Sequence, residues 1–67
     1  MNGTPYVVAL RALMHERALR VHAAWEEEKS LLHEGVPVRE ALAERRRRLH
    51  LIDEWYRAEL AKLEEER

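Results

Sequence analysis

The feature that most constrains the fold is the placement of the residues that break helices. After Pro5, glycine and proline occur only as Gly35 and Pro37, within the stretch HEGVPVRE near the middle of the 67 residues. Gly35 suits the left-handed position that ends a helix, and Pro37 suits the first turn of the next one. Thr4 offers an N-cap oxygen just before Pro5. The sequence therefore predicts a helix over about 5–33, a turn over about 34–36 and a helix over about 37–65.

Apolar residues recur in both segments at alternating spacings of three and four, close to a heptad repeat. They are Tyr6, Val7, Leu10, Leu13, Met14, Ala18, Val21, Ala24, Trp25, Leu31 and Leu32 in the first segment, and Val38, Ala41, Leu42, Leu49, Ile52, Tyr56, Leu60 and Leu63 in the second. A turn this short makes the two helices antiparallel. We expect an all-α fold in which residues 1–67 form one domain, an antiparallel two-helix hairpin with these residues as its core.

Self-association is the expected source of additional stability, because so short a chain rarely buries enough apolar surface alone. The sequence contains no cysteine, which excludes disulfides and thiolate metal sites. Leu51 and Trp55 are four residues apart and lie off the main apolar stripe of the second helix, and Leu19 belongs to a comparable patch on the first. We expect Leu19, Leu51 and Trp55 at the interface of a homodimer that forms a four-helix bundle.

The arginine run Arg45–Arg48 has a possible partner within the chain. If the turn centres near Val36, residues whose numbers sum to about 72 lie opposite each other, which brings Glu26–Glu28 level with the run. Four charged residues also fall inside or at the margin of the apolar stripes: Arg17, Glu28, Arg45 and Glu59. We expect two partly buried ion pairs that set the register, with Glu28–Arg45 as one of them. Alternatively, their aliphatic stems extend along the edge of the core.

A nucleic-acid-binding regulator is the alternative interpretation, with Arg46, Arg47 and Arg48 contacting the phosphates of RNA or DNA. Arg46 and Arg47 point away from the predicted core, and a two-fold dimer would repeat them on one surface. Against it, the sequence has 12 basic and 13 acidic residues, and Glu44 lies within the same helix at the favourable spacing to pair with Arg48. An internally paired, solvated helix face is the favoured interpretation of the run.

A metal-stapled bundle is the second alternative. His22 precedes Glu26 by four residues, His50 precedes Glu54 by four, and 22 and 50 sum to 72. Two imidazoles and two carboxylates suit a divalent ion such as zinc. Neither Glu-x-x-His nor His-Glu-x-x-His occurs, so surface histidines are the favoured interpretation, and no cofactor is expected.

An enzyme is not expected, because the one serine, Ser30, lacks a relay and no glycine-rich loop is available to bind phosphate. We expect a non-enzymatic protein–protein interaction module, structural or regulatory, whose partner is itself or another protein. The N-terminal segment has no basic region, and Arg11 interrupts its apolar run, which predicts a cytoplasmic protein without membrane contact. The many charges, with arginine favoured over lysine, are typical of a thermostable protein.

Overall fold

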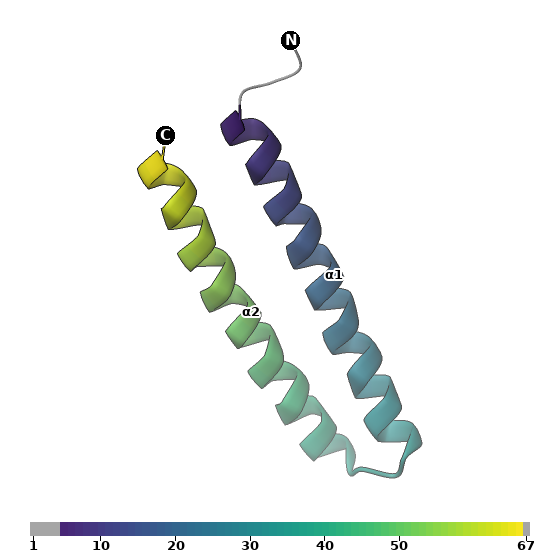
Figure 1. Cartoon of the computed structure of the whole chain (residues 1–67). Helices are drawn as coiled ribbons and strands as arrows, with labels where there is room; N and C mark the ends of the chain where they lie inside the picture. Colours follow the sequence, from purple (N-terminus) through teal and green to yellow (C-terminus); the bar gives the residue numbers. More distant parts are fainter. Residues whose placement is uncertain (1–4, 67) are drawn as a thin grey trace.

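The computed structural model describes residues 5–66, which form two α-helices joined by a short turn (Figure 1). Helix α1 spans Pro5–His33 and helix α2 spans Val38–Glu66. Their directions are opposite, so the start of α1 and the end of α2 lie at one end of the molecule and the turn lies at the other. The fold is thus an all-α antiparallel hairpin. The N-cap expected at Thr4 lies outside the described residues.

The turn is a Schellman motif centred on Gly35. The Val36 N–H donates to the Leu31 carbonyl at 3.0 Å, and the Gly35 N–H donates to the Leu32 carbonyl at 3.1 Å. Gly35 has a φ of 93°, in the left-handed region that favours glycine. The motif satisfies carbonyls that the end of α1 would otherwise leave without donors.

Helix α2 begins one residue later than the sequence predicts, because Pro37 precedes the helix rather than occupying its first turn. Its carbonyl accepts hydrogen bonds from the N–H groups of Glu40 and Ala41, each at 3.0 Å. These are the bonds that an N-cap residue makes with its main-chain oxygen. Glu40 then lies in the first turn of α2, where the helix dipole favours a negative charge.

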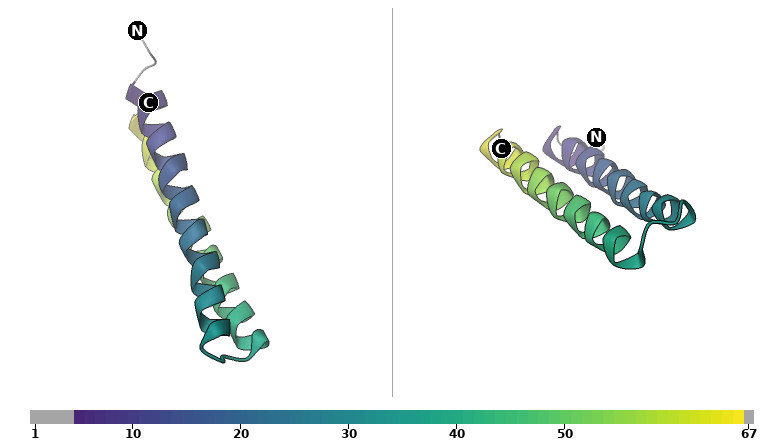
Figure 2. Two further views of the ribbon diagram at one scale, coloured as in Figure 1. Left: turned by 90° about the vertical axis from the view of Figure 1, so that its right-hand side faces the viewer. Right: turned by 90° about the horizontal axis from the view of Figure 1, so that it is seen from below.

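The hairpin is a single flat layer. Its Cα atoms span 51 × 21 × 9 Å, and one helix lies largely behind the other when the layer is viewed edge-on (Figure 2). The radius of gyration is 15.6 Å, whereas a compact domain of this length has about 11 Å. Each helix therefore packs against one other helix and presents the rest of its circumference outward.

The interior contains small side chains. Among residues 5–66, Ala24 and Ala41 are the buried ones, and they mark the line along which α1 and α2 touch, here called the contact line. Met14, Trp25, Leu32 and Val38 were expected in the core but are between 40% and 71% exposed. The difference has a geometric cause, because two rods meet along one line and side chains beside that line keep one side in water.

Candidate interaction surfaces

Near the turn, the contact line carries an ion pair between the helices. Arg45 Nη1 donates to both carboxylate oxygens of Glu28, at 2.9 and 3.0 Å, and the two side chains are 18% and 13% exposed. The Arg45 guanidinium also lies 4.0 Å from the centroid of the Trp25 ring. Their numbers, 28 and 45, sum to 73, close to the register expected from the turn. This is the Glu28–Arg45 pair that the sequence predicts.

The second expected pair, Arg17 with Glu59, does not form. The Arg17 guanidinium instead lies over the Tyr56 ring, 4.4 Å from its centroid, and the Glu59 carboxylate lies 3.5 Å from Lys62 Nζ. The same register explains this difference, because it brings Tyr56 level with Arg17 and leaves Glu59 nearly one turn further along α2. The interhelical contacts that match this register thus include an ion pair, Glu28–Arg45, and a cation–π contact, Arg17–Tyr56.

One broad side of the layer carries eleven large apolar side chains. Successive residues of a helix are rotated by 100°, and this rotation places six large apolar residues of α1 and five of α2 on the same side of the contact line. We call this surface the apolar face; it consists of Val7, Leu10, Met14, Val21, Trp25 and Leu32 on α1, and Val38, Leu42, Leu49, Tyr56 and Leu60 on α2. Each of these side chains is exposed or half-buried in the hairpin.

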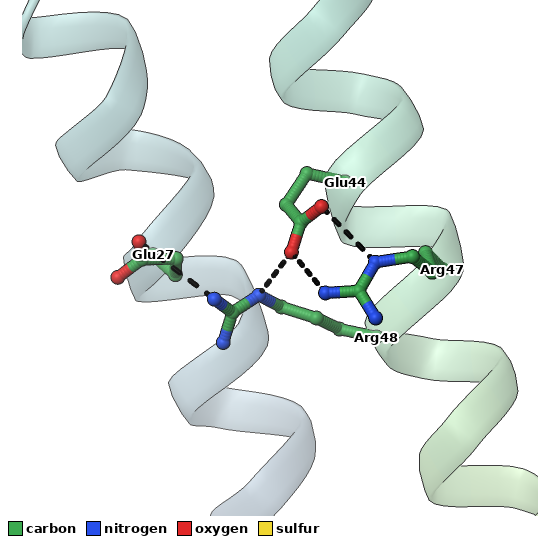
Figure 3. Close-up of polar contacts among 4 residues, drawn as sticks. All are labelled: Glu27, Glu44, Arg47 and Arg48. Carbon is green, nitrogen blue, oxygen red and sulfur yellow. Dashed lines mark hydrogen bonds and ion pairs between the residues drawn. The ribbon is translucent and has the colours of Figure 1, made fainter.

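The other broad side, the charged face, is a network of ion pairs. The Glu44 carboxylate accepts hydrogen bonds from Arg47 at 2.6 and 3.1 Å and from Arg48 at 3.0 Å, and Arg48 also reaches Glu27 of α1 at 3.9 Å (Figure 3). Arg20 of α1 completes this face: its Nε lies 3.2 Å from the Glu16 carboxylate.

A shallow groove of about 380 Å³ runs between the helices on the charged face. Its lining consists of Arg20, Ala23, Ala24, Arg47, Arg48, Leu51 and Ile52. The arginines in this lining already bond to carboxylates of the same chain. The groove therefore presents guanidinium groups whose charge is largely compensated.

Arg47 and Arg48 change the acidity of Glu44. The hydrogen bond from Arg47 is the main cause that lowers the pKa of Glu44 below its ordinary value, and the bond from Arg48 acts in the same direction. Reciprocally, the bond to Glu44 raises the pKa of Arg47. Glu44 therefore carries its negative charge throughout the neutral range, next to the arginine run.

The four consecutive arginines do not share one surface. Arg45 lies between the helices, Arg47 and Arg48 bond to Glu44 on the charged face, and Arg46 is exposed at the outer edge of α2 beside the apolar face. A site that follows a phosphate backbone needs several cations on one face. The trio of the nucleic-acid alternative, Arg46, Arg47 and Arg48, is brought together only in part.

The histidine pairs lie apart from each other. His22 Nε2 is 3.8 Å from Glu26 Oε1, and His50 Nε2 is 3.0 Å from Glu54 Oε1. Both pairs point away from the contact line, one on the outside of α1 and the other on the outside of α2. Within residues 5–66, no three metal-ligating side chains converge, so the four-ligand cluster of the metal alternative does not form.

The residues expected at the dimer interface are spread over two surfaces. Leu51 is exposed beside the groove on the charged face, and Trp55 is half-buried, with the Arg20 guanidinium 3.8 Å from its ring centroid. Leu19 is exposed on the outside of α1. Arg20 thus covers part of the ring that we expected to be a bare apolar patch.

The sequence interpretation missed the apolar face, whose residues we assigned to the core of the hairpin. The sequence contained a signal for this face. A pair of helices needs two apolar positions in each heptad, and an apolar stripe with further apolar residues beside those positions is wider than one neighbouring helix can cover. Trp25 widens the stripe beside Val21, one helical turn before it, and Met14 widens it beside Leu13. Stripes of this width are typical of helices that contact two or more neighbours.

No protein-family model, curated protein or solved structure matches this chain. In the described part of the chain, neither helix has a segment that combines the length and hydrophobicity needed to cross a lipid bilayer. The functional argument therefore depends on the two faces of the hairpin.

Proposed function

We propose that the protein is a non-enzymatic interaction module: a helical hairpin that associates with a second copy of itself to form a four-helix bundle. The observation that carries this proposal is the exposure of large apolar side chains on a hairpin in which Ala24 and Ala41 alone, among the described residues, are buried. An apolar surface of this extent on a small chain favours a protein interface.

The accessible area supports the same proposal. The hairpin exposes 5444 Å², whereas a compact monomer of 8.0 kDa exposes about 4,500 Å². The excess is about 1,000 Å², and each partner in a standard protein interface buries roughly 800 Å². Pairing two flat layers face to face gives every helix two neighbours and creates an interior that a single layer lacks.

The role of such a bundle would be structural or regulatory. Its charged face would remain outside as a rigid, ion-paired surface for a further protein. The groove on that face is open and shallow, and the arginines in its lining bond to carboxylates of the chain itself. Such a groove gives little of the desolvation that catalytic groups need.

Sedimentation equilibrium of the full chain tests this proposal. At micromolar concentrations we expect a mass of twice 8.0 kDa, falling to that of one chain on dilution. A fully helical, cooperatively folded monomer over the whole concentration range would refute the proposal.

A further inference from the structure

We propose that the second copy docks on the apolar face and that the charged face, with Leu51 and Trp55, lies outside the dimer interface. This inference rests on the proposed self-association and adds the surface that performs it. It also moves the interface away from Leu19, Leu51 and Trp55, the residues that the sequence alone favoured.

The first argument is the cost of removing charges from water. Docking on the charged face would bury Glu27, Glu44, Arg47 and Arg48, whose side chains are now between 30% and 59% exposed to solvent. Desolvation of such pairs offsets most of their attraction and contributes little net affinity. On the apolar face, the charged groups near the contact line are Arg17 over the Tyr56 ring and the Glu28–Arg45 pair, which the hairpin already shields.

The second argument is the regular spacing of the apolar face. Val7, Met14 and Val21 follow one another at intervals of seven residues on α1, as do Leu42, Leu49 and Tyr56 on α2. A repeat of seven keeps side chains on one side of a helix over several turns, which is the pattern that packs into a neighbouring helix. On the charged face the large apolar residues Leu51, Ile52 and Trp55 cluster within α2, opposite Arg20 and Ala23 of α1.

The third argument is which side chains remain exposed. Met14, Trp25, Leu32 and Val38 are four of the exposed large apolar residues, and all belong to the apolar face. They extend from the middle of α1 to the start of α2, so a second copy would cover them over the part of the layer nearest the turn. Among residues 5–66, the other three exposed large apolar residues lie off the apolar face, Val8 and Leu19 on the outside of α1 and Leu51 on the charged face.

A matched pair of substitutions tests the choice of face, because Met14 and Leu51 are each 48% exposed. In Met14→Glu, a charge placed in the interface should raise the dimer dissociation constant by at least about 30-fold. In Leu51→Glu, the constant measured by sedimentation should change by less than about threefold. Dissociation by Leu51→Glu, or equal effects of the two substitutions, overturns the inference.

A second readout does not depend on how a charged variant folds. Because the sequence contains no cysteine, Met14→Cys and Leu51→Cys each introduce a single thiol. In the dimer, the thiol at position 14 should react with a maleimide at least about tenfold more slowly than the thiol at position 51, and the rates should converge on dilution to monomer. Equal rates in the dimer, or slower reaction at position 51, contradict the inference.

Measuring the mass of the wild-type protein first distinguishes a failure of the proposed self-association from a failure of the proposed docking face. A monomeric wild-type chain defeats the proposed function and this inference together. A dimeric wild-type chain in which position 51 is the protected one leaves the proposed function standing and defeats only the choice of face.

Discussion

Gly35 controls the reversal of the chain through its backbone conformation alone. Its φ of 93° is unfavourable for residues with a side chain, yet no atom beyond the two neighbouring residues lies within 4 Å of the place where a Cβ would be. A substitution at this position therefore tests conformational strain without any steric clash. The neighbouring Pro37 contributes through its carbonyl, which accepts the first bonds of α2.

Gly35→Ala should lower the free energy of unfolding by about 1 kcal/mol, because alanine resists the left-handed conformation. Urea unfolding followed by circular dichroism at one fixed protein concentration measures this difference. Gly35→Asn is the matched control and should cost less, since asparagine visits this conformation more readily. An alanine variant as stable as the wild type would show that the turn does not require a positive φ.

Glu44 makes stability depend on pH in a defined direction. Hydrogen bonding from Arg47 lowers its folded-state pKa below the ordinary value of 4.5, so the unfolded chain binds a proton more readily than the folded one. The stabilisation that the ionised Glu44 carboxylate contributes is fully present above pH 4.5 and is lost as the pH falls through the folded-state pKa. We expect Glu44→Gln to be less stable than the wild type at pH 7, with the difference shrinking under acid. A difference that stays constant from pH 7 to about pH 2 contradicts this assignment.

At the scale of the helices, the Glu28–Arg45 pair connects α1 to α2 where most of the surrounding water has been removed. It contrasts with Asp53–Arg57, an ion pair within α2 whose atoms lie 3.1 Å apart but whose side chains are exposed. The two pairs have similar distances and differ in burial. Burial determines the cost of losing one partner, because a lone charge away from water has no compensation.

Glu28→Gln should lower the free energy of unfolding by about 1–3 kcal/mol, because it leaves the Arg45 charge half-buried beside Trp25 without a carboxylate. The matched exposed substitution, Asp53→Asn, should change it by less than about 0.5 kcal/mol. Chemical unfolding of both variants gives the comparison. Equal costs for the two would argue that burial does not strengthen the interhelical pair.

The sequence predicted the helices, the turn and the register well, because those depend on local signals. Breakers occur at Gly35 and Pro37, and a single turn then determines which residues lie opposite each other, as with Glu28 and Arg45. It predicted individual partners less well. Arg17 contacts Tyr56 instead of Glu59. These two candidate partners are about one helical turn apart on α2, and the apolar pattern is compatible with either alignment of the helices.

At the scale of the whole molecule, the sequence did not distinguish an internal core from an external face. Both produce apolar residues at helical spacing, and the number of neighbouring helices decides which side chains are covered. Trp25 and Met14 fit either environment by pattern, and the flat two-helix layer leaves both exposed. The two histidine pairs of the metal alternative do not meet, because level positions in an antiparallel pair need not face each other.

The central claim is that this hairpin completes its core with a second copy of itself, and the concentration dependence of thermal unfolding tests it most directly. If folding is coupled to dimerisation, a 100-fold rise in protein concentration adds about 2.7 kcal/mol per dimer and should raise the midpoint by about 10 °C. Circular dichroism melts of the full chain between about 5 and 500 μM measure this shift. A cooperative transition with the same midpoint at every concentration would contradict the account.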